Sequence, residues 1–325
     1  CPRYGHRITW CRQICPPTGD RGDCGRLAPH AMIGKTQAAI ALAERIRGEV
    51  VNCDSRQVYR GFPVITAQPT GKERSQCPHW LYGFLESWER VDAGTFSSQA
   101  CQVIDHVLAD QGMPILVGGT GLYLKSILFG LAQIPDIPEE MRNRVCQDYN
   151  RLGPDHMHAW LEKVDPEASV RIHARDRQRI TRALEVYLAT GKPLSEWQNR
   201  SRMAEPRFDA CQIGLWTELE QLTIGLESRI DRMLSGSALE EVRAAWSRCP
   251  DESAPGWSGI GCRELLQVHL GRLSLPEARE MWLKNTRAYA KRQMTWFKKH
   301  KGLMWLRPGH MDALKRMVDQ WLEQR

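Results

Sequence analysis

The sequence lacks several features that would place it in a membrane or a secretory pathway. It has no apolar run of roughly 18 residues, the length that a membrane-spanning helix needs. Its N-terminus has no apolar segment of the kind found in signal peptides. We therefore expect no membrane contact.

No Cys-x-x-Cys pair occurs among the 11 cysteines, which disfavours a zinc ribbon. The cysteines are scattered and odd in number, a pattern that favours a reducing compartment over a disulfide framework. We therefore expect a cytoplasmic location.

The charge balance is only moderately basic. Lys and Arg number 45 against 38 Asp and Glu, giving a net charge of +7, which permits a polyanionic partner without requiring one. With 325 residues, 42% of them hydrophobic, the chain can form one large domain or two smaller ones.

Residues 1–33 differ from the rest of the chain. They are rich in proline, glycine, cysteine and arginine and show little periodicity, so only residues 7–15 are compatible with a strand. The sequence does not begin with Met, which favours a natural start that lies upstream.

From Gly34 onward, short apolar strands alternate with amphipathic helices. Helices are expected at 35–47, 96–111 and 122–131, and strands at 49–53 and 113–117. Gly48 is expected to stop the first helix at its C′ position. This alternation is typical of a parallel α/β sheet flanked by helices.

A turn-rich stretch at 134–138 interrupts the pattern, and the chain then has helical character until an expected strand at 208–216. We predict a P-loop NTPase-like core formed by 1–133 and 207–325, carrying a helical insertion domain at 134–206. The C-terminal part of the core is expected to form helices at 218–235, 238–248, 276–300 and 310–324.

Gly34-Lys35-Thr36 has the composition of the end of a phosphate-binding loop. Free N–H groups at a helix start favour an anion, Lys35 adds a positive charge, and the Thr36 hydroxyl suits Mg²⁺. The full loop motif requires a glycine at position 29, which is Pro here. An ordinary helix start is the alternative.

Two polar turns follow the first two expected strands of the regular region. Asp54, Ser55 and Gln57 follow one of them, and the turn Gly118-Gly119-Thr120-Gly121 follows the other. In an open α/β sheet the carboxyl ends of the strands line the ligand crevice. A carboxylate there can accept a proton, and Ser55 and Gln57 can hydrogen-bond a base edge. The alternatives are that Asp54 only caps its turn and that the glycines are structural.

Two segments carry clustered positive charge. Arg175, Arg179 and Arg182 form a stripe along the expected helix 176–188, while Ile180 and Leu184 form its apolar face. Residues 287–301 interleave lysines and arginines with aromatic residues, a composition that suits single-stranded nucleic acid. The alternative for both is a solvated charged face over an apolar core.

Taken together, these segments resemble the bacterial type of tRNA dimethylallyltransferases, also called tRNA isopentenyltransferases. The resemblance rests on seven stretches in the family's order: GKT (34–36), DSRQVYRG (54–61), PILVGGTGLYLK (114–125), RIHARDRQRITRALEVY (171–187), TGKPLSEWQ (190–198), FDACQIGLW (208–216) and YAKRQMTWFK (289–298).

The resemblance implies an enzyme that transfers a dimethylallyl group from dimethylallyl diphosphate to the N6 amine of the adenosine 3′-adjacent to the tRNA anticodon. It implies Mg²⁺ as cofactor, with Thr36 as its ligand, and a monomer that binds the anticodon stem-loop. Asp54 is implied as the general base, Thr36 and Thr120 as further catalytic residues, and Gly34 and Lys35 as diphosphate ligands. The implied tRNA contacts are Asp54, Ser55, Arg56, Gln57, Thr120, Arg142, Gln178, Arg179, Arg182, Ser258, Gly259, Gly261 and Arg263.

The chain departs from the family in three places. Residues 29–33 do not match the Gly-Pro-Thr-Ala-Ser that precedes Gly-Lys-Thr, although 14–19 faintly resemble the missing strand and loop. Gly-Thr-Ala-Lys-Pro becomes 65–69, Ile-Thr-Ala-Gln-Pro, and Gly-Tyr-Arg becomes 261–263, Gly-Cys-Arg. Two other hypotheses therefore stay open: a catalytically impaired homologue that binds tRNA, and an unrelated P-loop kinase.

Overall fold

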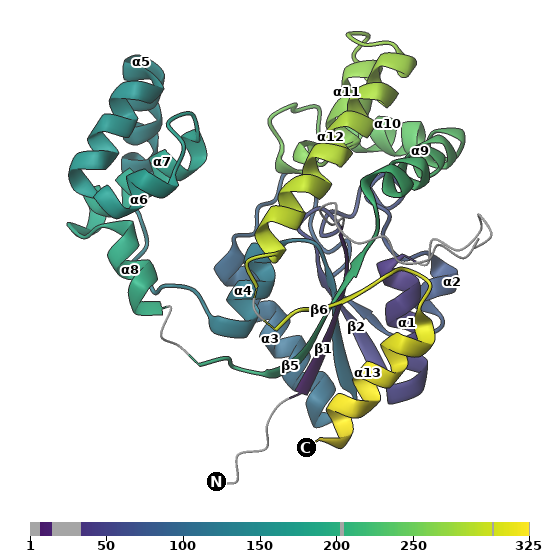
Figure 1. The fold of residues 1–325 in the computed structure, drawn as a ribbon. Helices are drawn as coiled ribbons and strands as arrows, with labels where there is room; N and C mark the ends of the chain where they lie inside the picture. Colours follow the sequence, from purple (N-terminus) through teal and green to yellow (C-terminus); the bar gives the residue numbers. More distant parts are fainter. Residues whose placement is uncertain (1–6, 15–33, 202–204, 301, 325) are drawn as a thin grey trace. The chain divides into compact units, whose positions relative to one another are not determined.

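The structure, a computed structural model, describes residues 7–14, 34–201, 205–300 and 302–324 (Figure 1). The chain divides into two compact units. Unit 1 comprises Cys1–Ile127 and Phe208–Arg325, and unit 2 comprises Leu128–Arg207. Unit 2 begins six residues before the predicted insertion, because the backbone N–H of Arg207 donates to the carbonyl of Leu128 at 2.7 Å and joins its two ends.

Unit 1 is built on a six-stranded sheet in the order β3-β2-β4-β1-β5-β6, in which every strand pair is parallel. The strands are β1 (Arg7–Ile14), β2 (Gly48–Cys53), β3 (His79–Trp80), β4 (Met113–Gly118), β5 (Asp209–Trp216) and β6 (Met304–Leu306). The predicted parallel α/β fold is confirmed. The edge strands β3 and β6 were not expected, because two or three residues carry no readable alternation.

Helices cover both faces of the sheet: α1 and α13 lie on one face, and α3 and α4 lie on the other (Figure 1). Unit 1 contains α1 (Lys35–Ile46), α2 (Gly71–Arg74), α3 (Ala93–Ala109), most of α4 (Gly121–Phe129), α9 (Leu219–Ser235), α10 (Ala238–Arg248), the 3₁₀ helix η1 (Pro255–Ser258), α11 (Cys262–His269), α12 (Leu275–Phe297) and α13 (Met311–Glu323). Buried side chains of α1, α13 and the sheet form one continuous apolar core, which includes Leu42, Ile115 and Leu314.

The end of α1 corrects one expectation. Arg47, not Gly48, takes the left-handed conformation that terminates the helix, with φ of 49°. Gly48 is instead the first residue of β2. A Cβ at position 48 would lie 2.9 Å from the backbone Cα of Ala43 on α1, so close packing between the helix and the strand favours glycine there.

Unit 2 is entirely helical, with α5 (Glu139–Val164), α6 (Pro166–Arg171), α7 (Arg177–Thr190) and α8 (Leu194–Ser201). Gly153 and Pro154 interrupt α5 with a kink, where Gly153 has φ of 80°. The buried carboxylate of Asp165 accepts from the backbone N–H groups of Ala168 and Ser195, and so satisfies the starts of α6 and α8 together.

No helix in the described part of the chain is both long and apolar enough to cross a membrane.

The closest approach in the sheet yields a test of stability. A Cβ at Gly118 would lie 2.1 Å from the carbonyl of Cys53 on β2, so Gly118→Ala must push two central strands apart. We expect this variant to lose about 2 kcal/mol or more of unfolding free energy, measured by urea denaturation. Gly71→Ala is the matched control, because no atom lies within 4 Å of a Cβ there. Equal stability of the two variants would contradict the packing argument.

Candidate active site

Two turns meet at the carboxyl edge of the sheet, where β2 and β4 end side by side with Cys53 paired to Gly118. Asp54 follows β2, and the turn Gly119-Thr120 follows β4. The backbone N–H of Thr120 donates to the Cys53 carbonyl at 3.1 Å. The structure thus brings the two polar turns predicted from the sequence into direct contact.

Asp54 is held by a buried amide and by its own turn. Asn52 is fully buried; its Oδ1 accepts from the Asp54 N–H at 2.9 Å, and its Nδ2 donates to the Asp54 carbonyl. Asp54 Oδ1 accepts from the Arg56 N–H at 3.0 Å, so the carboxylate does cap its turn. Its other oxygen, Oδ2, lies toward Gly119, 3.5 Å from the position of a Cβ there.

Ser55 and Thr120 form a second link between the turns. Thr120 Oγ1 accepts from the Ser55 N–H at 2.9 Å and donates to Ser55 Oγ at 3.1 Å. Both side chains are half-buried. This link fixes the residue after Asp54, and therefore the direction of the carboxylate itself.

Arg56 and Gln57 have protein partners already. The Arg56 guanidinium donates to the hydroxyl of Ser258, which is 202 residues further along the chain, so two predicted tRNA contacts lie together. Gln57 Nε2 donates to the carbonyls of Thr66 and Ala67 at 3.0 and 2.7 Å. Because these two bonds use the side-chain N–H groups of Gln57, its predicted hydrogen bond to a tRNA base would have to use the amide oxygen.

The start of α1 faces the same edge of the sheet. The helix leads directly into β2 and runs against it, so Gly34, Lys35 and Thr36 lie at the edge where β2 ends. Gly34 is the N-cap with extended backbone (φ −67°, ψ 172°) and provides no side-chain cap. The first turn therefore presents backbone N–H groups of the kind that bind anions. Residues 29–33 lie outside the described residues.

Sequence reasoning missed three side chains around Asp54. Burial, and secondarily the Asp54 carboxylate, raise the pKa of the Tyr82 phenol. The pKa of Tyr123 is raised as well, chiefly by burial. Both phenols are therefore neutral at physiological pH. Tyr82 lies just after the short β3 and Tyr123 inside α4, and neither position carried a pattern that singled it out.

Arg229 on α9 is the third missed residue. It retains an exposed surface, yet enclosure by neighbouring atoms lowers the pKa of its guanidinium, while attraction to Asp54 opposes that shift. Arginine stays charged in proteins, so Arg229 supplies a fixed positive charge near the carboxylate. No motif marks it, because a single arginine on an amphipathic helix is common.

The loop around 258–263 packs against the segment in which the chain departs from the family. Gly261 has φ of 94°, and a Cβ there would lie 2.8 Å from Ile65 Cγ2 and 2.5 Å from the Trp282 indole. Cys262 and Gly259 are buried, whereas Ser258 and Arg263 are exposed. Ile65 and Cys262 are thus core residues. At both positions the chain departs from the family pattern with a buried side chain, not with an exposed residue of the loop.

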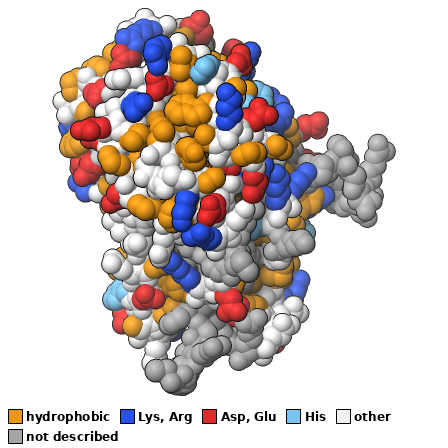
Figure 2. Space-filling model, turned by 90° about the vertical axis from the view of Figure 1, so that its left-hand side faces the viewer, with side chains coloured by type: hydrophobic (Ala, Val, Ile, Leu, Met, Phe, Trp, Pro, Cys, Tyr) orange, Lys and Arg blue, Asp and Glu red, His pale blue; other side chains and the backbone are white. Residues whose placement is uncertain are grey.

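Within unit 2, the predicted tRNA residues separate into two groups. Arg142 and Arg182 both interact with Glu185. Burial raises the pKa of the Glu185 carboxyl, and the two arginines oppose this rise. Arg182 Nη1 lies 3.6 Å from Glu185 Oε2. Gln178 and Arg179 are exposed at the start of α7, where Arg179 approaches Asp176 at 3.4 Å. Figure 2 shows acidic, basic and hydrophobic side chains interspersed on the face in view.

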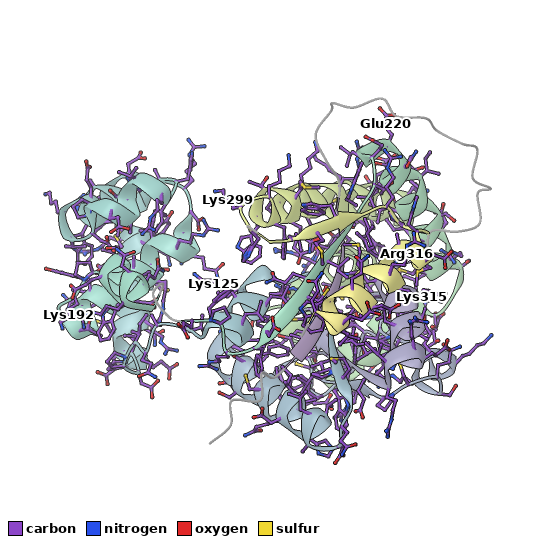
Figure 3. The ribbon with its side chains drawn as sticks, turned by 60° about the horizontal axis from the view of Figure 1, so that its bottom comes forward. Lys125, Lys192, Glu220, Lys299, Lys315 and Arg316 are labelled. Carbon is purple, nitrogen blue, oxygen red and sulfur yellow. The ribbon has the colours of Figure 1, made fainter. Side chains whose placement is uncertain are left out.

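The basic and aromatic segment near the C-terminus divides between core and surface. Met294 and Phe297 are buried, and Trp296 is half-buried. Arg287, Lys291, Arg292, Lys298 and Lys299 are exposed, and Lys299 is labelled just after α12 in Figure 3. For the aromatic residues, packing is the better interpretation; Lys301 lies outside the described residues.

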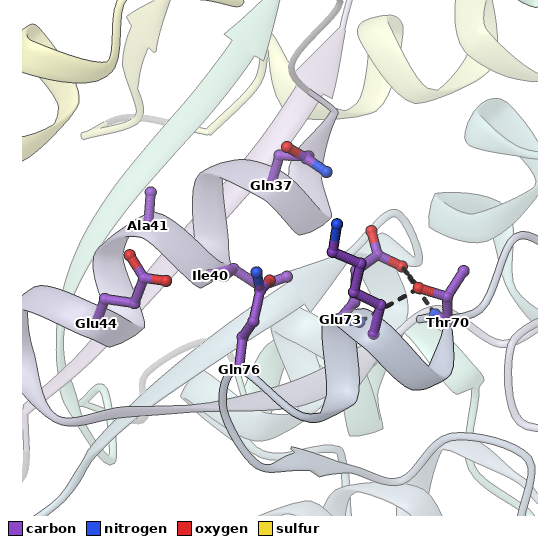
Figure 4. A pocket seen from close by; sticks show the side chains of 8 residues that line it. Gln37, Ile40, Ala41, Glu44, Thr70, Glu73 and Gln76 are labelled. Atoms are coloured by element: carbon purple, nitrogen blue, oxygen red, sulfur yellow. Dashed lines mark hydrogen bonds between the residues drawn. The ribbon is translucent and has the colours of Figure 1, made fainter.

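A cavity of about 470 Å³ lies between α1 and α2, away from Asp54 and Thr120 (Figure 4). It is lined by Gln37, Ile40, Ala41, Glu44, Thr70, Lys72, Glu73 and Gln76. Thr70 and Glu73 bond to each other as the capping box of α2. The cavity flanks the side of α1 and contributes no group to the site at the strand ends.

Comparison with known proteins identifies the family to which this chain is similar. Residues 57–300 match the family model described as IPP transferase, a match that begins just after Asp54. The chain is 50% identical to the tRNA dimethylallyltransferases of Maridesulfovibrio salexigens and Nitratidesulfovibrio vulgaris, over 89% of its length and 94% and 93% of theirs.

Solved structures agree. The full-length tRNA isopentenylpyrophosphate transferase of Bacillus halodurans is 27% identical with a TM-score of 0.67, over 98% of this chain and 96% of that one. A eukaryotic dimethylallyltransferase acting on tRNA is 27% identical with a TM-score of 0.77, over 97% and 77%. The chain therefore belongs to the IPP transferase family.

Proposed function

We propose that this enzyme transfers a dimethylallyl group from dimethylallyl diphosphate to the N6 amine of the adenosine 3′-adjacent to the anticodon in tRNA. The observation that carries the proposal is the Asp54 carboxylate, fixed at the carboxyl edge of the sheet by Asn52 and the Ser55–Thr120 link. The names of the relatives supply the substrate class.

The residues of the site suit this transfer. The allylic C–O bond of the diphosphate breaks, the N6–C bond forms, and diphosphate leaves with the electron pair. An aromatic amine is a weak nucleophile until its proton has an acceptor, and Asp54 would be that acceptor. The start of α1, with Lys35, and the Arg229 guanidinium would stabilise the negative charge that grows on the diphosphate.

The α1 start also fits Mg²⁺. Thr36 is half-buried in the first turn, where its hydroxyl can be an oxygen ligand beside the diphosphate. Mg²⁺ is usually held by one or two protein oxygens plus substrate phosphates and water, so no larger cluster of carboxylates is needed. When bound, the ion would neutralise the leaving diphosphate.

We propose that tRNA is recognised by the predicted residues of both units. The unit 1 candidates are Asp54, Ser55, Arg56, Gln57, Thr120, Ser258, Gly259, Gly261 and Arg263. The unit 2 candidates are Arg142, Gln178, Arg179 and Arg182, of which the first three are exposed. The target base must leave its stack to reach Asp54, which costs roughly a few kcal/mol. We also propose that the protein acts as a monomer in the cytoplasm.

The described cysteines agree with a reducing setting. Cys77, Cys146, Cys211, Cys249 and Cys262 form no disulfide. Burial raises the pKa of Cys77 to about 11 and that of Cys211 to about 12, so these thiols stay protonated at physiological pH. Protonated thiols are poor nucleophiles and poor metal ligands, so these two cysteines are not candidates for a catalytic role.

The function is tested by incubating the chain with radiolabelled dimethylallyl diphosphate, Mg²⁺ and unmodified tRNA. We expect label in the tRNA, and digestion to nucleosides should locate it on the adenosine next to the anticodon. Binding of tRNA without transfer would instead support an impaired homologue. Turnover of ATP without transfer would support a kinase.

Asp54→Asn tests the general base. The amide keeps an oxygen for the Arg56 N–H but cannot accept the proton, so we expect kcat to fall about 100-fold or more with little change in KM. Asp92→Asn is the matched control, because Asp92 makes the same kind of backbone cap at the exposed start of α3. A variant at position 54 that keeps the wild-type kcat would exclude Asp54 as the base.

Arg229→Gln tests the anion-binding role. Loss of the positive charge should raise KM for dimethylallyl diphosphate about tenfold, while KM for tRNA changes little. Arg316→Gln removes an exposed arginine on α13 and serves as the control (Figure 3). An unchanged diphosphate KM in the Arg229 variant would show that this guanidinium does not bind the substrate.

A further inference from the structure

Helix α12 contacts the turn after β4 through the side chains of Gln293 and Trp296. Gln293 Nε2 donates to the carbonyl of Gly119 at 3.0 Å, across 174 positions of the chain. Three residues further on, the Trp296 indole packs against Gly121, where a Cβ would lie 2.6 Å from ring atoms. Residues 287–301, whose composition suits a nucleic-acid surface, thus also contact the turn after β4.

The bond from Gln293 completes the restraint of one peptide group. The carbonyl of the Gly119–Thr120 peptide accepts from Gln293, and its N–H donates to the Cys53 carbonyl at 3.1 Å. A peptide group bonded at both ends cannot rotate without breaking one of the two bonds. This peptide carries Thr120, whose hydroxyl bonds to Ser55 next to Asp54.

Gln293 and Asp54 both lie beside Gly119. A Cβ at this position would lie 2.5 Å from Gln293 Nε2 and 3.5 Å from Asp54 Oδ2. A side chain at position 119 would therefore have to displace the Gln293 amide. The Gln293 amide and the Asp54 carboxylate lie beside the same glycine, so a displacement of Gly119 would change the positions of both groups.

We propose that Gln293 is a positioning residue for the transfer reaction. By fixing the Gly119–Thr120 peptide, it keeps Thr120 bonded to Ser55 and so holds the Asp54 carboxylate in the direction needed for proton transfer. This role rests on the proposed function. It requires no contact between Gln293 and either substrate.

A purely structural role for Gln293 fits the packing less well. Helix α12 is anchored by the buried side chains Ala278, Trp282, Met294 and Phe297, whereas Gln293 is only half-buried. Loss of one hydrogen bond should leave that anchor intact. We therefore expect variants at Gln293 to fold and to lose rate selectively.

Two variants of the full chain test the proposal by steady-state kinetics with tRNA and dimethylallyl diphosphate. Gln293→Met keeps the length of the side chain without a donor, and Gln293→Glu places an acceptor opposite the Gly119 carbonyl. We expect kcat to fall about tenfold for Met and further for Glu, because small displacements at a reacting centre are costly. KM for both substrates should stay within about twofold, as expected when ground-state binding is untouched.

Gln102→Met and Gln102→Glu are matched controls, because Gln102 is exposed on α3. The thermal unfolding midpoint of each variant is measured alongside. An unchanged kcat in Gln293→Met overturns the proposal, and so does a raised KM at constant kcat, which would mean substrate contact. A fall in kcat that only parallels loss of folded protein overturns it as well.

The unaltered chain and Asp54→Asn are assayed in the same series, so the two proposals fail differently. Absence of transfer by the unaltered chain overturns both. Transfer by the unaltered chain together with full activity of Gln293→Met overturns only the role of Gln293.

Discussion

The pairing of β2 with β4 is the constraint on which the candidate site depends. Cys53 and Gly118 face each other so closely that no side chain fits at position 118. Because both strands end there, the residues that follow them leave the sheet side by side. Asp54 and Thr120, 66 positions apart in the sequence, are neighbours for this reason.

Hydrogen bonds from polar groups then orient the Asp54 carboxylate. Buried Asn52 holds the backbone of Asp54 on one side, and Thr120 holds Ser55 on the other. The carboxylate therefore has one oxygen committed to its own turn and another directed toward Gly119. In the proposed mechanism, a carboxylate so restrained needs little reorganisation to accept a proton, which is the general advantage of a preorganised site.

Sequence reasoning worked where a local pattern determines the structure. Alternating apolar strands and helices predicted the parallel sheet, and the turns after 53 and 118 predicted the edge where the site lies. It failed where tertiary packing decides. Gly48 has the sequence context of a helix stop, but Arg47 ends the helix and Gly48 pairs with Met113 as the first residue of β2. The short strands β3 and β6 exist only because the neighbouring strands pair with them.

Residues that reach the site from elsewhere in the chain were the hardest to find. Arg229 and Gln293 come from α9 and α12, more than 100 positions after Thr120, and each is an ordinary helical residue by composition. Gln293 lies within the family stretch 289–298, but its basic and aromatic neighbours were compatible both with a nucleic-acid surface and with a solvated face over an apolar core. Such roles follow from three-dimensional contacts that periodicity does not encode.

The hydrogen bond between Arg207 and Leu128 brings together the two points at which the chain enters and leaves the helices of unit 2. A module whose two ends meet can be lengthened, shortened or exchanged during evolution without stretching the strands of its host. The helices of unit 2 and the turns at the strand ends of unit 1 can therefore diverge at different rates.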